Sequence, residues 1–363
     1  METSKLPTYL KLSQIVMGLT AFFYILYIGQ DIIVPLIYAM LIAMLLNPLV
    51  NRLCRYKLPR VIAILIAILA GFLLISAVIY FISTQSIKFS SSFPLLKEKF
   101  NMMFKDLIDW MSHAFNLSTQ KINSSVNNIK NQGMENGGVV IGQTLGTLSG
   151  ALVLIFLLPV YVFMILFYKS LLVEFIGRLF PKAQHATVGE VLIETKSLVQ
   201  NYLVGLLVEM AIVAALNTIA LLLLGIQYAI LLGVIGAILN LIPYIGGVVA
   251  IALPMLIAIA TKEPVYALYV FIAYIIVQFI DNNFLVPKIV ASKVKINALV
   301  SIVVVLIGGA LWGIAGMFLS IPLTAILKVM FDRIEPLKPW GFLLGDTIPA
   351  IVSFKIKLPK KKT

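Results

Sequence analysis

The segment QFIDNNFLVPK, residues 278–288, places an acid and several amides at the end of a long apolar run. Gln278, Asp281 and Asn282 recur at steps of three and four, the spacing that puts side chains on one helix face. A carboxylate in the middle of a bilayer costs about 2.5 to 3.5 kcal/mol, so such an acid normally faces a cavity or a partner. Together with Asn283, these side chains could bind a small polyol or exchange a proton for a cation. We therefore predict a substrate- or ion-binding site here.

An interfacial position is the alternative for Asp281. There the acid would form an ion pair with Lys288 or Lys293 instead of lining a binding site. Pro287, which cannot donate a backbone hydrogen bond, is predicted to act as a hinge beside the site.

Other polar groups interrupt a second apolar region, 197–261. Glu209 is its one charged residue, and it could belong to the binding site or pair with Lys196 near the surface. Asn240 could bind substrate through its amide or cap a broken helix. Asn217 is predicted to form a hydrogen bond between helices, a common role for amides in membrane bundles.

Chemistry based on metals, thiols or nucleotides is not indicated. His113 and His185 are far apart and lack the acid or Cys spacing of a metal site. The single cysteine, Cys54, cannot form an internal disulfide. The sequence contains no phosphate-binding loop. It also lacks the two facing aspartates or the His-Glu-x-x-His helix that an intramembrane protease needs. We expect no cofactor, no metal and no enzymatic activity.

Composition indicates a membrane protein. Hydrophobic residues make up 61% of the 363 residues and charged residues only 12%, whereas soluble domains have about 25% charged residues. Several uncharged runs exceed the roughly 20 residues that a helix needs to cross the hydrocarbon core. These runs cover residues 61–87, 136–168 and 296–327. The net charge of +13 does not indicate nucleic-acid binding, because the basic residues lie between the apolar runs and form no patch with aromatics.

Eight apolar segments follow one another along the chain, which predicts an all-α polytopic membrane protein. They lie at about 10–29, 32–50, 60–83, 149–169, 204–225, 228–260, 265–286 and 299–330. Gly29, Asp31 and Pro35 predict a tight turn that makes the first two segments an antiparallel pair. Amphipathic helices are expected from Pro94 onward and, lying at the membrane interface, from residue 188 to residue 202.

Two segments are too long for simple spans. A straight helix over 228–260 would reach about 50 Å, whereas the hydrocarbon core is about 30 Å thick. Residues that break helices lie inside both segments, and backbone freed in this way is tolerated at membrane depth only next to protein or water. We predict two re-entrant hairpins, with kinked spans as the alternative. The hinge residues are Pro243, Gly246 and Gly247 in the first hairpin, and Gly308, Gly309, Gly313, Gly316 and Pro322 in the second.

The two hairpins, each with its preceding helix, would form inverted repeats. Such paired, interrupted segments point to the binding site of a secondary transporter. With hairpins, the Lys and Arg count favours cytoplasmic N- and C-termini. The expected parts of the chain are a three-helix membrane segment (1–83), an extracytoplasmic helical interval (84–148), a fourth membrane helix with an interfacial helix (149–203), a transport core (204–332) and a basic cytoplasmic tail (333–363).

Four motifs in a fixed order carry a resemblance to a known family. They are YLVG at 202–205, NLIPYIGG at 240–247, FIDNNFLVPKIV at 279–290 and LIGGALWGIAGMFLSIPLTAILK at 306–328. Over nearly its whole length the chain resembles the bacterial AI-2E family, in which a Glu often stands in place of Asp281. The resemblance implies a multi-pass transporter of the bacterial inner (plasma) membrane and a homo-oligomer, with pentamers known among family members.

Three functions remain open at this point. The first is a permease that exports a small polar metabolite such as autoinducer-2, a quorum-sensing signal. The second is an antiporter that exchanges Na+ or Li+ for a proton at Asp281, with Glu209 as a second acid. The third is a scaffold that transports nothing. Lipid and a small polar solute or monovalent cation are the expected partners, and nucleic acid is not.

Overall fold

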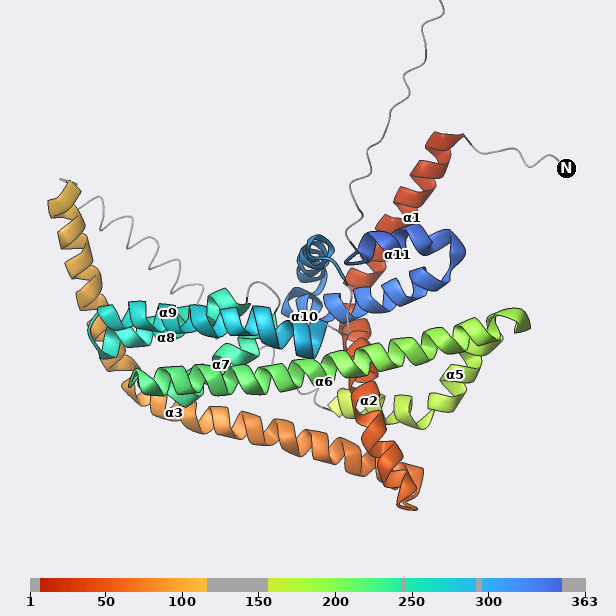
Figure 1. Cartoon of the computed structure of the whole chain (residues 1–363), viewed down its shortest axis with the longest axis horizontal. Helices are drawn as coiled ribbons and strands as arrows, with labels where there is room; N and C mark the ends of the chain where they lie inside the picture. Colours follow the sequence, from red (N-terminus) through yellow and green to blue (C-terminus); the bar gives the residue numbers. More distant parts are fainter. Residues whose placement is uncertain (1–6, 116–155, 243–245, 292–295, 348–363) are drawn as a thin grey trace, which may run out of the picture.

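The protein is described by a computed structural model over residues 7–115, 156–242, 246–291 and 296–347. Within these ranges the chain is helical, apart from one isolated bridge between Ile296 and Gly345. This confirms the all-α fold. Pro243, residues 116–148 of the expected extracytoplasmic interval and the end of the basic tail lie outside the described residues. Figure 1 shows the helices, which are α1 (Thr8–Ile28), α2 (Gln30–Arg55), α3 (Arg60–Phe115), α5 (Lys169–Arg178), η1 (Lys182–Gln184), α6 (His185–Leu223), α7 (Ala229–Asn240), α8 (Gly246–Thr261), α9 (Val265–Ile280), η2 (Asp281–Ala291), α10 (Ala298–Arg333), η3 (Glu335–Leu337) and α11 (Lys338–Leu344).

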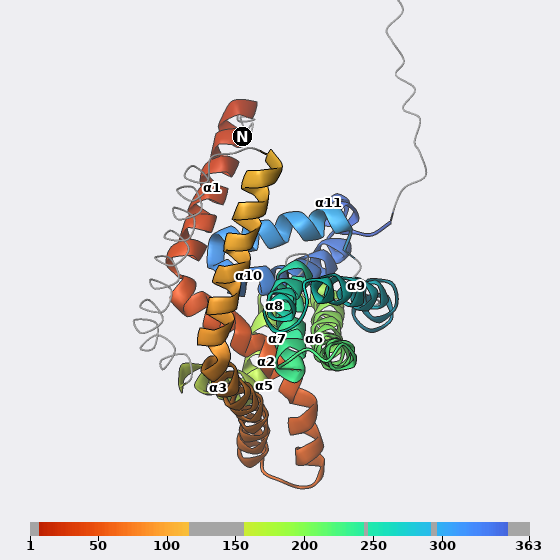
Figure 2. The ribbon, with the colours of Figure 1, turned by 90° about the vertical axis from the view of Figure 1, so that its left-hand side faces the viewer.

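The first two helices do not form the predicted antiparallel pair. Figures 1 and 2 show α1 and α2 meeting end to end at a bend. The backbone N–H of Gly29 donates to the carbonyl of Ile25, and the N–H of Ile33 donates to the carbonyl of Gly29. Helical hydrogen bonding therefore passes through Gly29, and Pro35 lies inside α2. The prediction of an antiparallel pair was wrong because α2 continues from α1 at a bend at Gly29 and does not reverse direction.

The third helix is longer than the third apolar segment. α3 is one helix over 56 residues, and it includes the start of the amphipathic pattern that was expected as a separate helix. The fourth apolar segment forms a helix over Phe156–Phe167, after which the chain bends by 63° into α5.

The sixth helix joins two predicted elements. The interfacial helix expected up to residue 202 does not turn before the next span, because α6 is one helix of 39 residues. From Leu206 to Leu221 its buried positions recur at steps of three and four, so one face packs against the protein over this part of the helix. The expected boundary at 203/204 falls inside this helix.

The first long segment folds back, as predicted for a hairpin. α7 ends at Asn240, and α8 begins at Gly246. A Cβ placed on Gly236 would lie 3.6 Å from the Cβ of Ala250. In an unbroken helix these positions would be about 21 Å apart. Gly246 lies so close to the carbonyl of Leu239 that a side chain there would collide with it.

The second long segment also folds back. α10 is broken at Trp312 and Gly313, and Gly313 has φ +60°. Gly308 and Gly316 lie so close that a Cβ on either would collide with the backbone carbonyl of the other. Both ends of α10 also reach Gly345, because the side chain of Asn297 donates to its carbonyl and Lys328 Cε would lie 3.5 Å from a Cβ on Gly345.

The two hairpins approach α6 from opposite ends. At the end of α6, Gly225 lies next to the side chain of Lys262, which follows the first hairpin. At the start of α6, Glu190 and Glu194 form ion pairs with Arg333, the last residue of α10. Because α9 starts beside Gly225 and runs back along α6, these two helices are antiparallel (Figure 1). This is the inverted arrangement that the sequence predicts.

A large part of the surface is apolar. Among the described residues, five helices are long and apolar enough to cross a membrane, or six if the bent pair that begins at residue 156 forms one span. Large hydrophobic side chains of α1, α3 and α9 are exposed, among them Ile25, Leu73 and Ile276. Such a surface requires lipid or further protein around it. The chain is therefore a multi-pass membrane protein in contact with the bilayer.

Candidate functional site

Asp281 is the most buried acid in the described part of the chain. Its exposed fraction is 1%, and it stands where α9 gives way to the π-helix η2. The buried residues of α9 are Ala267, Val270, Tyr274 and Val277, and one further step of four leads to Asp281. The acid thus takes the next place on the face that α9 turns toward α6. π-helices are rare and often lie at functional sites.

Asn240 connects this acid to the tip of the first hairpin. Its Nδ2 donates to Asp281 Oδ2 at 2.8 Å. Asn240 can reach α9 because α7 ends there and the chain turns. The other oxygen of Asp281, Oδ1, is buried and has no hydrogen-bond partner among the described residues. A buried acceptor left in this way is costly, by about 1 to 3 kcal/mol, unless something binds it.

Glu209 of α6 faces the same point. Its exposed fraction is 7%, and its carboxyl group is within hydrogen-bonding reach of Asp281. An ionised carboxylate can only accept hydrogen bonds, so a bond between these two groups requires a proton on one of them. The ion pairs in the described ranges involve neither acid. Glu209 therefore lies against Asp281, and the alternative pairing with Lys196 is not observed.

Gln278 joins the site through the second residue of α8. A Cβ on Gly247 would lie 2.8 Å from Gln278 Oε1 and 3.4 Å from Asn240 Oδ1. Two side-chain amides and the backbone of the hairpin tip thus meet beside Asp281. The structure brings together Asp281, Glu209, Asn240 and Gln278, and we refer to these four residues as the carboxyl–amide cluster.

Asn282 and Asn283 do not belong to this cluster. Both are exposed, and Asn283 Nδ2 donates to the carbonyl of Phe279 at 2.9 Å. Consecutive positions of a helix point in different directions, so only Asp281 continues the buried face. Pro287 is also exposed, within η2. Lys288, a possible partner of the acid, lies over the ring of Phe284, with 6.0 Å between its Nζ and the ring centroid.

Two residues that were not predicted as binding residues form a second polar level. Asn217 of α6 and Tyr274 of α9 both lie within 3.4 Å of the position that a Cβ on Gly236 would occupy. Asn217 Oδ1 and the Tyr274 hydroxyl are buried and have no hydrogen-bond partner among the described residues. The hydrogen bond predicted for Asn217 is therefore not seen at its oxygen. Their spacing could have revealed this level, because Asn217 lies eight residues after Glu209 and Tyr274 seven before Asp281.

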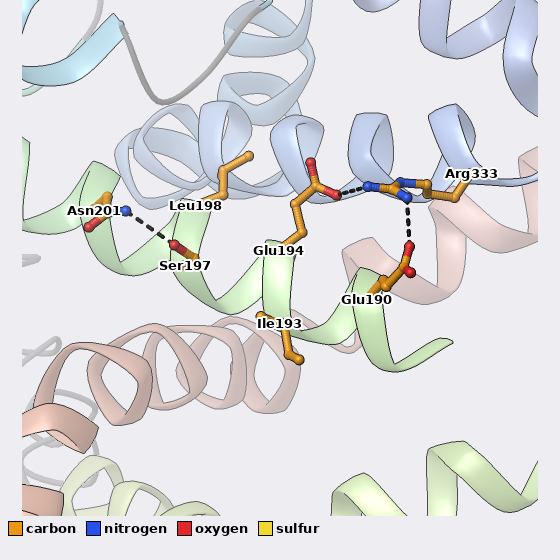
Figure 3. A pocket seen from close by; sticks show the side chains of 7 residues that line it. All are labelled: Glu190, Ile193, Glu194, Ser197, Leu198, Asn201 and Arg333. Carbon is orange, nitrogen blue, oxygen red and sulfur yellow. Dashed lines mark hydrogen bonds and ion pairs between the residues drawn. The ribbon is translucent and has the colours of Figure 1, made fainter. Parts of the chain in front are cut away.

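A solvent-open pocket lies on α6 toward its start. Its volume is about 530 Å³. Figure 3 shows Arg333 donating to Glu190 and Glu194, at 2.8 and 2.9 Å, along one side of it. The residues that line it are Glu190, Ile193, Glu194, Ser197, Leu198, Asn201 and Arg333.

An apolar cluster lies between this pocket and the carboxyl–amide cluster. It includes Tyr202, Leu203 and Leu206 of α6 together with Leu319 of α10, and both hairpins contribute from near their tips through Leu241 and Trp312. Two helical turns separate Asn201 from Glu209 along α6. The acids are therefore closed off from the pocket by packed side chains.

No group of His, Cys, Asp and Glu in the described ranges is suited to hold a metal ion. The site instead combines a carboxyl pair, amides and the tip of the first hairpin near the middle of a long membrane helix. In membrane proteins, broken helices of inverted repeats that meet near acidic groups are typical of secondary transporters.

Comparison with known proteins identifies the family. The sequence profile of the AI-2E family of transporters matches residues 15–335, so this chain belongs to the AI-2E family. It is similar to the AI-2 transport protein TqsA of Escherichia coli (strain K12), with 28% identity over 88% of this chain and 90% of TqsA. It is also 28% identical to YrrI of Bacillus subtilis (strain 168), provisionally named a transport protein, over 83% of this chain and 86% of YrrI.

Proposed function

We propose that this protein exports a small polar metabolite such as autoinducer-2 across the bacterial inner (plasma) membrane. The observation that carries the proposal is the burial of Asp281 in a membrane bundle. One of its oxygens is bound to the tip of a broken helix, and the other has no hydrogen-bond partner in the described part of the chain. A solute hydroxyl could donate to that free oxygen. The family supports transport, and the name of TqsA, at 28% identity, supports this substrate.

Movement of one repeat against the other would carry the solute past the bilayer. The pocket beside Arg333 opens on the side that we assign to the cytoplasm, with both chain termini, and the packed side chains of the hairpin tips close the way inward. Opening on the cytoplasmic side requires Leu241 and Trp312 to separate from α6. We further propose a homo-oligomer, of five copies as in other family members, which would cover part of the exposed apolar surface.

Flux through purified protein in proteoliposomes tests the export function. We expect vesicles loaded with autoinducer-2 to release it when they contain the protein, and Asp281→Asn to slow this release strongly while the oligomer keeps its size in gel filtration. Asp346→Asn, a change at an exposed acid, is the matched control. Full release by Asp281→Asn would remove the acid from the mechanism.

A Na+(Li+)/H+ antiporter is the second candidate, and the carboxyl pair favours it. Glu209 and Asp281 can hold one proton between them, and a monovalent cation that displaces this proton leaves the net charge unchanged. A pH-sensitive dye in the vesicle lumen distinguishes the two functions. Addition of Na+ outside must change the lumenal pH if the protein is an antiporter, whereas a metabolite exporter produces release of solute without that response.

A further inference from the structure

Three basic side chains, Arg60, Lys169 and Lys196, lie close to one another at a place separate from the carboxyl–amide cluster. Arg60 is the first residue of α3, and its guanidinium donates to the carbonyl of Leu166 at 2.6 Å. Lys169 is the first residue of α5 and lies just past that carbonyl. Lys196 of α6 and Arg60 are the charged groups that act on Lys169, and both carry its own sign.

The charge of this cluster is not balanced by the described residues. Burial, together with the positive charges of Lys196 and Arg60, lowers the pKa of Lys169, which lies beyond the last residue of the apolar helix Phe156–Phe167. Helix N-termini carry partial positive charge, and α3 and α5 both begin here. The recorded ion pairs of the described ranges include none of the three cations. An anion at this point would relieve the repulsion.

A buried amide supplies a further donor. Asn47 of α2 is 5% exposed, and its Oδ1 accepts a hydrogen bond from Lys169 Nζ at 3.2 Å. Its Nδ2 is buried and has no acceptor among the residues that the structure describes. Nδ2 and Oδ1 belong to the same amide, so this unused donor lies beside Lys169. Asn47, Lys169 and Arg60 together offer N–H groups with few acceptors, which is the chemistry that binds phosphate.

The surface that leads to these donors is apolar. Phe156, Val160, Met164 and Phe167 are exposed and recur at steps of four and three, so they form one outward face of their helix. The face ends at Tyr168, which is 48% exposed, directly before Lys169. An aromatic residue at this position is typical of the membrane–water interface. Acyl chains could lie along this face while a head group reaches the cations.

We propose that Arg60, Asn47, Lys169 and Lys196 bind the phosphate group of an anionic phospholipid. Basic pockets between membrane helices bind phosphate-bearing head groups in this manner. A soluble phosphate has the same charge, but it would gain nothing from the adjoining apolar face. The lipid would join α2, α3, α5 and α6, which meet here, and would therefore stabilise the fold independently of the solute that is transported.

Thermal unfolding of the full chain in detergent tests the site. We expect phosphatidylglycerol to raise the Tm, whereas phosphatidylcholine with the same acyl chains and inorganic phosphate leave it unchanged. Lys169→Gln should weaken the apparent affinity for phosphatidylglycerol about fivefold, the effect of one cation near a lipid phosphate. Lys169→Arg should keep the affinity because it keeps the charge. Lys182→Gln, which removes an exposed cation nearby, is the matched control.

Lys196→Gln provides a second variant if Lys169→Gln does not fold. Native mass spectrometry of the wild-type protein adds a readout without any substitution, and phosphatidylglycerol should remain bound more often than phosphatidylcholine. The proposal is overturned if phosphatidylglycerol stabilises no better than phosphatidylcholine, or if Lys182→Gln weakens it equally. If inorganic phosphate raises the Tm as much as phosphatidylglycerol does, the proposal of a lipid is overturned and the site binds a soluble anion.

Discussion

Asp281 and Glu209 act on each other, and the ion pairs seen within the described ranges involve neither of them. Both carboxyl groups are buried within hydrogen-bonding reach, and two like charges so close in a poorly hydrated place cannot both stay ionised. We propose that the pair behaves as one proton-binding unit. On this proposal, the unit accepts a cation or a hydroxyl donor once its proton leaves.

Coupling between the two acids can be measured in a double-mutant cycle. Asp281→Asn and Glu209→Gln should each lower the transport rate roughly ten- to hundredfold, the effect of losing a hydrogen bond to a charged group. The double variant should be no slower than the slower single variant, because both changes disable the same unit. Glu263→Gln, at an exposed acid, is expected to leave the rate unchanged. If the fold reductions of the two single variants multiply in the double variant, the acids work independently.

Much of the site could be predicted at the level of single residues. Asp281, Glu209, Asn240 and Gln278 stood out because polar groups in uncharged apolar runs need a reason to be there. The sequence could not predict that Asn282 and Asn283 lie outside the site, since this depends on which face of α9 packs against α6. Tyr274 was missed because a tyrosine in an apolar helix looks like an ordinary core residue.

The elements around the site follow from the places where helices break. NLIPYIGG and GGALWGIAG predicted both hairpins, because Gly and Pro inside overlong apolar segments leave few other solutions. The same signal failed at Gly29 and Pro35. Near the start of a helix, Pro removes few hydrogen bonds, so the chain bends there and stays helical.

A disulfide can test the first hairpin in the membrane. With Cys54→Ser as background, Gly236→Cys and Ala250→Cys would place their Cβ atoms near the 3.6 Å measured here, within the range of about 3.5 to 4.5 Å for a disulfide. We expect oxidation to cross-link this pair and to protect both thiols from maleimide. The pair would stay reactive if residues 228–260 formed one straight span.

The contact between Gly308 and Gly316 can be tested in the second hairpin. Gly316→Ala introduces a methyl group against the carbonyl of Gly308, and overpacking of this kind costs about 1 to 3 kcal/mol. We expect a lower Tm in detergent. Gly18→Ala in α1, where nothing lies within 4 Å of the new methyl group, should not lower the Tm. Equal effects of both changes would contradict the close approach.

At the scale of the whole molecule, the two hairpins approach α6 from opposite ends, so we expect them to enter the membrane from opposite faces. Glu263 follows the first hairpin, and Glu335 follows the second. In the Cys54→Ser background, a maleimide that cannot cross the membrane should label Glu263→Cys in intact cells and should reach Glu335→Cys only after lysis. Labelling of both positions from outside would show that the hairpins share one face.

The sequence repeats alone could not predict that the single helix α6 packs against both hairpins. Its length exceeds what one span needs, and the sequence pattern suggested a break near residue 203 that does not occur. Packing decides this, because the same continuous face contacts α7, α9 and α10. Local patterns carry no information about such shared contacts.

Glu209 of the carboxyl pair lies well inside α6, far from either end of this helix, and this position has an electrical consequence. A charge that travels from one face of the membrane to the pair crosses only part of the voltage, and the full drop is worth about 2.3 kcal/mol per elementary charge at 100 mV. Occupancy of the pair by a proton or cation should therefore depend on the resting potential of the cell. The membrane potential would then shift the equilibrium between the inward-open and outward-open states of the protein.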